Sequence, residues 1–356
     1  MDFEERLALI KQVGEEILTE EELIELLKTK NKLSAYDGFE PSGKIHIAQG
    51  LLRAQNIKKL MKAKIDFTFF VADWFALINN KLGGDIGNIK TAGNYFIETW
   101  KACGLDTDKI KVVWAEEHIK DPEYWNKVIK IAQASTIPRV LRCSEIMGRT
   151  EKDSQYASMI FYPCMQAADI FHLDADIAQL GMDQRKVNVL AREIAPKFKW
   201  KKPIAIHHHM LMGLGEPPKE TEGVERALAL KMSKSKPDTA IFMTDSSEEV
   251  ERKIKNAYCP QSQVHENPIM EYSKYIVFEN SPVLEIKRPE KYGGDLSIES
   301  YDVLVQLYSQ GKVHPLDLKK AVSENINNLL NPIRKHFEKG KAKELLEKVE
   351  GFTVTR

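Results

Sequence analysis

The chain has 356 residues, and its 52 basic and 52 acidic side chains give a formal net charge of zero. This length is too great for one small core and predicts two domains. The balanced charge excludes a strong overall field that would attract nucleic acid, so a nucleic-acid partner would have to be bound by local basic patches. No apolar run reaches a membrane-spanning length, and we expect no membrane partner.

The cysteines indicate reduced thiols rather than a disulfide framework. They lie far apart, without the paired spacing of a zinc knuckle, at Cys103, Cys143, Cys164 and Cys259. Residues 1–28 are acidic and amphipathic, whereas a signal peptide has an apolar run after a basic tip. We therefore expect a cytoplasmic protein.

The first half of the chain alternates between predicted helices and strands. Residues 3–30 have leucine and isoleucine at helical spacing, and Thr19 with Glu22 three residues later predicts a capping box. After them we predict strands at 34–38, 66–72 and 111–114, and helices at 51–64 and 88–103. This order is typical of a Rossmann-like, doubly wound parallel sheet and predicts the α/β class.

The second half is predicted to be mostly helical. Residues 120–170 have a helical pattern, whereas 177–180 and 204–207 are candidate strands. Beyond residue 242 we predict helices at 248–257, 316–328 and 332–349. We therefore divide the chain into a larger α/β domain, residues 1–245, with a helical insertion at about 120–170, and a smaller α-helical domain, residues 246–356.

A doubly cationic stretch, Lys231-Met232-Ser233-Lys234-Ser235, follows a loop that contains glycine and proline. Two lysines three positions apart among serines are suited to bind phosphate oxygens, because an ammonium is a compact donor to anionic charge. A solvated basic loop is the alternative interpretation. A second stretch, far upstream, favours the phosphate site.

The second stretch runs from Gly38 to Gly50 and is typical of a glycine-rich turn that leads into a helix. Gly43 would allow the backbone to come close to a ligand, and His46 lies where the next helix begins. A helix N-terminus beyond a strand offers free N–H groups to anions. A capping or packed histidine is the alternative for His46. Together the two stretches indicate the two sides of a nucleoside triphosphate site.

Tyr162, Gln166 and Asp169 have the spacing i, i+4 and i+7, which places them on one face of a helix. We expect Pro163 in the first turn of that helix. An exposed polar face is the alternative, but the neighbouring residues are mostly apolar. A phenol, an amide and a carboxylate that are buried together indicate a ligand pocket.

Asp183 follows a predicted strand in the stretch Gly181 to Lys186. A carboxylate in this position can accept hydrogen bonds from ribose hydroxyls, and a plain N-cap is the alternative. The stretch His207-His208-His209 suggests a metal site. Adjacent residues on a strand point to opposite faces, however, so these three side chains are poorly placed to chelate one ion. We predict no metal site and packing of the histidines near the nucleotide.

Together these residues resemble the tyrosyl-tRNA synthetases of archaea and eukaryotes, which are class I aminoacyl-tRNA synthetases. The resemblance covers nearly the whole chain, and several independent motifs in the right order make it specific. The motifs are Tyr36 through His46, Tyr162 through Asp169, Gly181 through Lys186, Lys231 through Ser235, Lys287 through Asp295 and His314 through Asp317.

The resemblance implies ATP-dependent attachment of L-tyrosine to tRNA(Tyr) through a tyrosyl-adenylate, with ATP and Mg²⁺ as co-substrate and no prosthetic group. It implies that Tyr36 and Asp169 bind the phenolic hydroxyl of tyrosine. The ammonium group of tyrosine would be held by Tyr162, Gln166 and Gln184.

The resemblance also implies which residues bind ATP and tRNA. The expected ATP-binding residues are Gly38, Gly43, His46, Asp183, Lys231, Ser233 and Lys234. The expected catalytic residues are His46, Lys231 and Lys234. The expected tRNA contacts are Arg139 and Arg142 at the acceptor end and His314 and Asp317 at the first anticodon base. A homodimer, with tRNA contacting both subunits, is implied as well.

The chain departs from the family pattern in two places. The family's first signature is His-x-Gly-His, but this chain has His46-Ile47-Ala48-Gln49, so the second histidine is missing. We therefore expect the lysine stretch to contribute more to binding the triphosphate. Glu117 and His118 lie in a segment that lines the family's substrate pocket, and they have no residue-by-residue match there.

Two other functions stay open at this point. A tryptophanyl-tRNA synthetase shares the fold and both signatures, but an indole has one donor and more bulk, which suits a pair of tyrosine and aspartate less well. A synthetase-like protein that binds RNA without aminoacylating it would not need the lysine stretch or a complete polar pocket. For a synthetase, catalysis would consist of positioning and of electrostatic stabilisation of the phosphoryl transition state.

Overall fold

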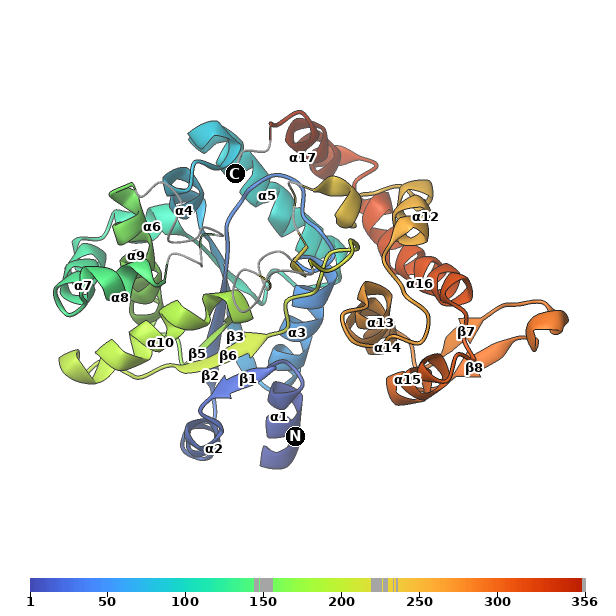
Figure 1. The fold of residues 1–356 in the computed structure, drawn as a ribbon. Helices are drawn as coiled ribbons and strands as arrows, with labels where there is room; N and C mark the ends of the chain where they lie inside the picture. The colour runs from blue at the N-terminus through green and yellow to red at the C-terminus, as the bar shows by residue number, and fades with distance from the viewer. Residues whose placement is uncertain are drawn as a thin grey trace.

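The computed structural model describes residues 1–143, 147, 156–218, 226, 230–232, 234 and 236–353. A six-stranded sheet lies at its centre with helices on both faces, and a second, mainly helical region lies beside it (Figure 1). The strand order is β1-β6-β5-β2-β3-β4, and all neighbours are parallel except β1 and β6. The strands are Glu16–Leu18 (β1), Leu33–Phe39 (β2), Ile65–Val71 (β3), Lys111–Trp114 (β4), Ile177–Gly181 (β5) and Ile204–His208 (β6). The predicted α/β, Rossmann-like class is confirmed.

The helices around the sheet mostly follow the strands in the predicted alternation. They are Phe3–Lys11 (α1), Glu20–Thr29 (α2), Leu51–Lys62 (α3), Asp73–Ile78 (α4), Ile86–Ala102 (α5), Ala115–Ile119 (α6), Pro122–Gln133 (α7), Ile137–Leu141 (α8), Ser158–His172 (α9) and Arg185–Ile194 (α10). Helices α6 to α9 lie between β4 and β5, and of these α7, α8 and most of α9 lie within residues 120–170, where the helical insertion is predicted. The five strands that the sequence predicts are all present.

Each face of the sheet has its own apolar core, because successive side chains on a strand point to opposite sides. Phe69 and Phe70 on β3 illustrate this. The ring of Phe69 stacks on Trp100 of α5 with centroids 4.1 Å apart, on the face covered by α3 and α5. Phe70 lies on the opposite face, where its ring is 6.5 Å from Tyr36 and 4.9 Å from His118. The second core therefore surrounds the residues predicted to bind a ligand.

Strand β1 corrects the prediction that residues 3–30 are helical. It separates α1 from α2 and pairs antiparallel with β6, with Ile17 opposite Ile206. The chain passes close to the sheet just before it, since a Cβ at Gly14 would lie 2.8 Å from Ile206. Thr19 does cap α2, by accepting from the N–H of Glu22 at 3.2 Å. The Glu22 carboxylate instead binds Arg192 and Lys202, so the reciprocal half of the predicted capping box is not formed.

Helix α9 corrects the expectation that Pro163 lies in a first turn. The helix begins at Ser158, so Pro163 lies in its interior and one i→i−4 hydrogen bond is missing there. Burial of the residues around it, including Met159 and Ala167, keeps the helix continuous. The predicted one-sided arrangement of polar residues along α9 is unaffected.

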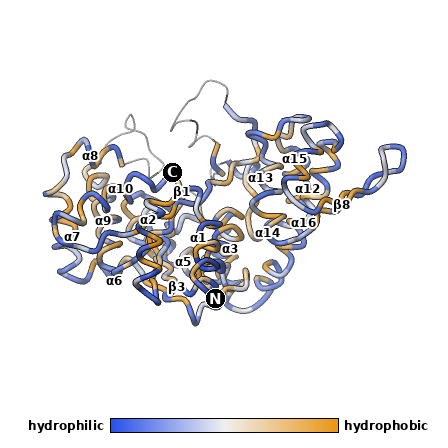
Figure 2. The backbone as a smooth tube through the Cα atoms, turned by 90° about the horizontal axis from the view of Figure 1, so that it is seen from below, coloured by the Kyte–Doolittle hydropathy of each residue, from blue (hydrophilic) through white to orange (hydrophobic). Residues whose placement is uncertain are grey.

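The C-terminal region is helical with one small antiparallel sheet, which was not predicted. Its elements are Ser247–Asn256 (α12), Pro268–Tyr272 (α13), a π-helical turn Ser273–Val277, Phe278–Asn280 (α14), Leu284–Ile286 (β7), Leu296–Ile298 (β8), Tyr301–Ser309 (α15), Pro315–His336 (α16) and Gly340–Glu350 (α17). Helix α16 runs through Pro332, where a break was expected, because Leu330 and Ile333 on either side are buried. The loop that joins β7 to β8 projects from this region and is hydrophilic (Figure 2).

The end of the C-terminal region returns to the α/β part of the molecule. Helix α17 packs against α5, and the ring of Phe337 lies 5.3 Å from that of Tyr95. His336 Nε2 lies 3.0 Å from a carboxylate oxygen of Glu98. The division at residue 245 stays a prediction. Across the described ranges, no helix combines the length and the apolar composition that a membrane crossing requires.

Replacing Leu60 by alanine tests the core beneath the sheet. Leu60 is fully buried in α3, so its truncation leaves a cavity, and we expect the free energy of unfolding to fall by about 2–5 kcal/mol. The matched control is Leu316→Ala, since Leu316 is 60% exposed in the first turn of α16, and its effect is expected to stay within about 0.5 kcal/mol. Urea denaturation followed by circular dichroism measures both. Equal losses for the two variants would contradict this assignment of the core.

Candidate active site

The sheet has its topological switch point between β2 and β5, which are parallel neighbours paired at Ala35–Ile177 and Tyr36–Ala178. From β2 the chain continues to β3 on one side, and from β5 to β6 on the other. Ligands of such sheets bind in the crevice beyond the carboxyl ends of the strands at this point. The stretch after β2 contains His46, and the residue two positions after β5 is Asp183. His46 and Asp183 therefore follow the carboxyl ends of two neighbouring strands, and we refer to the region beyond these strand ends as the crevice.

Tyr36 and Asp169 lie in the interior of this crevice, one on β2 and the other on α9. Both side chains are buried, and the Tyr36 hydroxyl finds no hydrogen-bond partner among the residues that the structure describes. Burial raises the pKa of Tyr36 well above its ordinary value, and the nearby charges of Asp169 and Asp37 raise it further. Tyr36 is therefore a neutral hydroxyl whose donor finds no partner among the described residues, and it lies close enough to Asp169 to feel the charge of that carboxylate.

His118 is a member of this pocket that the sequence analysis could not place. It lies on α6, and its Nδ1 is 2.9 Å from Asp169 Oδ1, with both side chains almost completely buried. Burial raises the pKa of Asp169 to about 6, while the hydrogen bond and the charge of His118 act to lower it. Tyr124 of α7 also lies beside Asp169, and its hydroxyl donates to the Met165 carbonyl at 3.2 Å. No motif marks these two residues, because their contacts join segments that are far apart in sequence.

Tyr162, Gln166 and Asp169 are all buried on one face of α9, so the alternative of an exposed polar face is wrong. The amide of Gln166 donates to Gln184 Oε1 at 2.9 Å. Burial raises the pKa of Tyr162 well above its usual value, and the carboxylates of Glu40, Asp169 and Asp183 add to this. The Tyr162 hydroxyl is therefore within electrostatic reach of both halves of the crevice.

The predicted cationic residues line the other half of the crevice. Lys231 Nζ lies 3.2 Å from Asp183 Oδ2. Lys234 Nζ donates to Ser42 Oγ at 3.0 Å and lies 4.8 Å from the centroid of the Phe96 ring. Burial lowers the pKa of Lys234 to about 7; Glu40 raises it and Lys81 lowers it. Ser233, which the resemblance places in the same site, lies outside the described residues.

His46 is buried between the lysine stretch and the start of α3. Its backbone forms an antiparallel bridge with Phe242, and its carbonyl accepts from the N–H of Gly50, the N-cap of α3, at 2.8 Å. The pKa of His46 is well below its ordinary value because of burial, with Lys234, Lys231 and Arg53 contributing. The ring is therefore neutral, and within the described part of the chain its buried Nδ1 has no hydrogen-bond partner.

Gly38, near the end of β2, and Gly43, in the turn after it, differ in whether the structure requires a glycine. Gly43 has φ +101°, a left-handed conformation that other residues rarely adopt, so the turn itself requires glycine there. A Cβ at Gly38 would make only an ordinary contact, 3.8 Å from Phe70. Gly38 is therefore not required by the protein's own packing in this structure.

Several other charged and polar residues of the crevice were not predicted as site residues. Arg53 of α3 binds Asp37 through its Nη1. Burial raises the pKa of Asp37 to about 6, Arg53 lowers it, and Asp183 raises it again. Glu40 accepts from Asn79 Nδ2 at 3.0 Å, and burial raises its pKa against the opposing charges of nearby lysines. Asp37 and Glu40 belong to the stretch that the sequence analysis singled out, which is the only signal that could have found them.

The three consecutive histidines contact different partners. His207 bridges Glu16 and Asn188, and His208 Nδ1 lies 2.6 Å from the amide nitrogen of Gln179. His209 lies between Glu15 and Glu271, at 3.0 and 3.1 Å. Each imidazole is thus held by its own hydrogen bonds, and the three are not arranged as a common set of ligands.

The residues expected to contact tRNA lie outside the crevice. Arg139 binds Glu193 through Nε and Nη2 at 3.1 and 3.0 Å, and Arg142 is exposed just after α8. His314 is the exposed N-cap of α16, where its Nδ1 accepts from the N–H of Leu316 at 3.2 Å, and Asp317 lies in the first turn.

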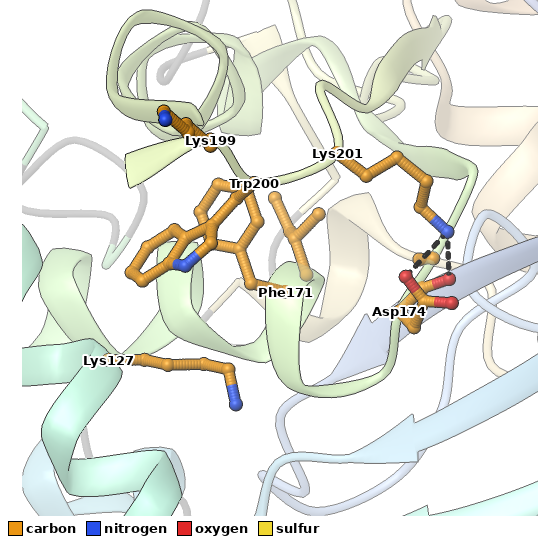
Figure 3. A pocket seen from close by; sticks show the side chains of 8 residues that line it. Lys127, Phe171, Asp174, Lys199, Trp200 and Lys201 are labelled. Atoms are coloured by element: carbon orange, nitrogen blue, oxygen red, sulfur yellow. Dashed lines mark hydrogen bonds and ion pairs between the residues drawn. The ribbon is translucent and has the colours of Figure 1, made fainter. Parts of the chain in front are cut away.

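A groove of about 270 Å³ lies near the amino ends of β5 and β6 (Figure 3). Its lining includes Lys127, Phe171 and Trp200, and Lys201, whose ammonium lies 2.7 Å from Asp174 Oδ1. Because ligands of doubly wound sheets bind beyond the carboxyl ends of the strands, this groove is at the wrong end to be the active site.

Known proteins are similar to this chain over nearly its whole length. The profile of the family described as tRNA synthetases class I (W and Y) matches residues 28–331. Tyrosine--tRNA ligase 1, cytoplasmic, of Arabidopsis thaliana is 47% identical over 100% of this chain and 90% of its own length. Tyrosine--tRNA ligase of Sulfolobus acidocaldarius is 45% identical over 100% of both chains.

Solved structures give the same result. Tyrosyl-tRNA synthetase of Pyrococcus horikoshii, complexed with L-tyrosine, superposes with a TM-score of 0.91 at 40% identity, covering 98% of this chain and 100% of that one. Tryptophanyl-tRNA synthetase of Aeropyrum pernix has a TM-score of 0.68 at 17% identity, covering 96% of this chain and 86% of that one, which shows a shared fold only. The chain therefore belongs to the class I tRNA synthetases of the tryptophan and tyrosine group, and within that group to the tyrosine–tRNA ligase family.

Proposed function

We propose that this protein attaches L-tyrosine to tRNA(Tyr) with the use of ATP. The observation that carries the proposal is the crevice at the switch point, which has two chemically different halves. One half is a buried pocket with the Asp169 carboxylate and the Tyr36 hydroxyl, which has no partner in the described part of the chain. The other half gathers lysines around His46 and Asp183. The relatives named tyrosine–tRNA ligase support the same activity.

The reaction has two steps, and neither needs a nucleophile from the protein. First, a carboxylate oxygen of tyrosine attacks the α-phosphorus of ATP, the bond to the departing pyrophosphate breaks, and tyrosyl-adenylate forms. Second, a hydroxyl of the terminal ribose of tRNA attacks the tyrosyl carbonyl carbon, and AMP leaves. The protein therefore acts by holding the reactants in line and by stabilising the charge of the phosphoryl transition state.

Tyrosine would be recognised at both of its ends. Its phenolic hydroxyl would donate to Asp169 and accept from the Tyr36 hydroxyl, which has no other partner among the described residues. Its ammonium would be held by Tyr162 together with Gln166 and Gln184, whose amides are already hydrogen-bonded to each other. An indole cannot both donate and accept at its ring nitrogen, so this pocket favours tyrosine over tryptophan.

ATP would be bound along the turn after β2 and by the lysine stretch. Gly38, near the end of β2, and Gly43 and His46, in the turn after it, would face the phosphates. Lys231 and Asp183 form an ion pair with each other. Bound ATP would replace this ion pair: its ribose hydroxyls would donate to the Asp183 carboxylate, and its phosphate oxygens would accept from the Lys231 ammonium. Mg²⁺ belongs to the proposal as the ion that ATP brings, bound through phosphate oxygens.

The remaining assignments rest on the family resemblance. Arg139 and Arg142 would contact the acceptor end of tRNA, Ser233 the phosphates, and His314 and Asp317 the first anticodon base. A homodimer is supported by apolar side chains that protrude from the neighbouring helices α7, α8 and α9, among them Ile129, Ile137 and Phe161, each more than half exposed. The relatives named cytoplasmic support that location.

The deciding experiment is ATP–pyrophosphate exchange measured with each of the twenty amino acids. Tyrosine alone should support exchange, and the purified protein should then charge tRNA(Tyr). Exchange with tryptophan instead would establish the tryptophanyl alternative. No exchange with any amino acid would favour the non-catalytic RNA-binding alternative.

Replacing Lys234 by alanine should lower the rate of pyrophosphate exchange by about 10²-fold, because one preorganised donor to the transition-state charge is lost. The dissociation constant for tyrosine should stay the same, since Lys234 contacts the other half of the crevice. Lys236→Ala is the matched control, because Lys236 is an exposed lysine of the same loop. An unchanged rate in Lys234→Ala would remove this residue from the catalytic site.

The same residue predicts a pH dependence. Because the pKa of Lys234 is about 7, its ammonium is charged below pH 7 and loses its proton as the pH rises. In the wild type, kcat/KM for ATP should therefore fall as the pH rises through about 7. Lys234→Arg stays charged over this range, so its kcat/KM for ATP should not fall near pH 7 in this way. The titration of ATP itself affects both proteins equally, so it cancels in the ratio of their kcat/KM values. Identical profiles would contradict the assignment.

Replacing Asp169 by alanine should relax selectivity for tyrosine over phenylalanine by about 10- to 100-fold. In the wild type, phenylalanine leaves buried polar groups of the pocket unpaired, and the variant removes one of these groups. The measurement is the ratio of kcat/KM for the two amino acids in pyrophosphate exchange. Asp174→Asn, a substitution of an exposed aspartate near the start of β5, is the control. A variant that rejects phenylalanine as strongly as the wild type would contradict the role of Asp169.

Replacing His118 by leucine should move the acidic limb of the tyrosine profile. In the wild type, kcat/KM for tyrosine should fall as the pH falls through about 6, because the Asp169 carboxylate becomes protonated and no longer accepts. In the variant, His118 no longer lowers the pKa of Asp169, so the effect of burial is opposed by fewer groups and this pKa rises. The decrease in kcat/KM for tyrosine should therefore begin at a higher pH. His265→Leu, at an exposed histidine, controls for the loss of an imidazole. An unshifted limb would show that His118 does not tune Asp169.

A further inference from the structure

A four-residue segment, Leu211–Leu214, runs between the end of β6 and the lysine stretch, and we refer to it as the frame segment. Met212 forms an antiparallel bridge with Lys231. Beside this bridge, the N–H of Gly213 donates to the carbonyl of Leu230 at 2.7 Å. The frame segment is therefore joined to the chain that enters the lysine stretch.

The same segment is joined to the lysine stretch at two further points. The N–H of Met232 donates to the carbonyl of Leu211 at 3.2 Å, and the N–H of Leu214 donates to the carbonyl of Thr239 at 2.9 Å. Thr239 lies beyond the lysines, so both arms of the loop that carries Lys231 and Lys234 are hydrogen-bonded to the frame segment. The position of the loop ends is thus set by the position of this segment.

The other edge of the frame segment is held by the C-terminal region. In an antiparallel bridge of this kind, the N–H and C=O of Met212 point away from Lys231. The carboxylate of Glu271 accepts from the Met212 N–H at 3.0 Å, and the hydroxyl of Tyr272 donates to the Met212 carbonyl at 3.1 Å. The N–H of Tyr258 donates to the carbonyl of Leu214 at 2.8 Å. Glu271 and Tyr272 are the last two residues of α13, so one short helix end occupies both polar groups of Met212.

Burial makes these contacts hard to replace by water. Met212 is 3% exposed and Tyr272 is completely buried. Glu271 is also fixed in place, because its carboxylate contacts His209 Nε2 at 3.1 Å, and the His209 ring stacks on Tyr275 with centroids 4.2 Å apart. If either contact to Met212 were lost, a buried backbone group would be left without a partner.

We propose that Glu271 and Tyr272 are positioning residues for the lysine loop, which fix the frame segment and thereby hold Lys231 and Lys234 where they meet the phosphates of ATP. This inference rests on the proposed function of the crevice. The inference predicts an effect on one substrate and not on the other. The ATP-dependent step should depend on α13, whereas tyrosine binding should not, because Tyr36 and Asp169 are carried by β2 and α9.

The test is Tyr272→Phe in the full chain, which removes one hydroxyl. We expect kcat/KM for ATP in tyrosine-dependent pyrophosphate exchange to fall by about 2- to 13-fold, the range for loss of one hydrogen bond of ordinary net strength. The matched control is Tyr308→Phe. Tyr308 is equally buried in the C-terminal region, and its hydroxyl donates to a backbone carbonyl, that of Pro260, at 2.8 Å. It should lose stability to a similar extent but keep kcat/KM for ATP within about twofold of wild type.

A second pair of variants separates the hydrogen bond from the charge. Glu271→Ala removes the acceptor of the Met212 N–H, whereas Glu271→Gln keeps an amide oxygen that can accept it. We expect the loss in kcat/KM for ATP to appear in Glu271→Ala and to be largely restored in Glu271→Gln. Tyrosine affinity, measured by equilibrium dialysis, should equal that of wild type in all four variants, which also shows that they are folded.

The outcomes distinguish this inference from the proposed function. Wild-type protein without tyrosine-dependent exchange would overturn the proposed function and this inference with it. The inference alone would be overturned if the wild type is active and kcat/KM for ATP in Tyr272→Phe and in Glu271→Ala equals that in Tyr308→Phe. A parallel loss of tyrosine affinity in Tyr272→Phe would also overturn it, because the contact would then support the whole fold rather than the loop.

Discussion

The pairing of β2 with β5 is the constraint on which the rest of the site depends. These strands are 142 positions apart at their paired residues, Ala35–Ile177 and Tyr36–Ala178, and their parallel contact creates the switch point of the sheet. Chain segments leave the two strands in opposite directions, so a crevice opens between them. The turn with His46 borders it from one strand and Asp183 from the other. Without this register, the phenol pocket and the lysines would not share one space.

Burial imposes a common electrostatic pattern on this crevice. The pKa of Lys234 and that of His46 are lowered, mainly by desolvation, whereas those of Asp169 and Asp37 are raised for the same reason. All four groups are therefore moved toward their neutral forms in the protein alone. An anionic phosphate beside Lys234 would reverse the shift and favour the ammonium. In the proposed function, bound ATP would thus restore the charge of Lys234 in the state that stabilises the transition state.

The parts that could be predicted are those with a local signal. An apolar run bounded by charges marks β3, and the i, i+4, i+7 spacing of Tyr162, Gln166 and Asp169 places them on one face of α9. What could not be predicted depends on distant partners. Strand β1 is three residues long and exists because it pairs with β6. The bond between His118 and Asp169 spans 51 positions, so no spacing rule reveals it.

The segment that holds the lysine loop has hydrogen bonds across the boundary that we predict at residue 245. A bridged segment has two polar edges, and both must find partners when water is excluded. The lysine loop pairs with one edge of the frame segment. At the other edge, Glu271 and Tyr272 bind the N–H and the carbonyl of Met212. The C-terminal region therefore completes the hydrogen bonding of the catalytic crevice rather than merely adjoining it. Helix α17 also packs on α5, whose Phe96 ring lies 4.8 Å from Lys234 Nζ, so the C-terminal region contacts the surroundings of the lysines at both of its ends.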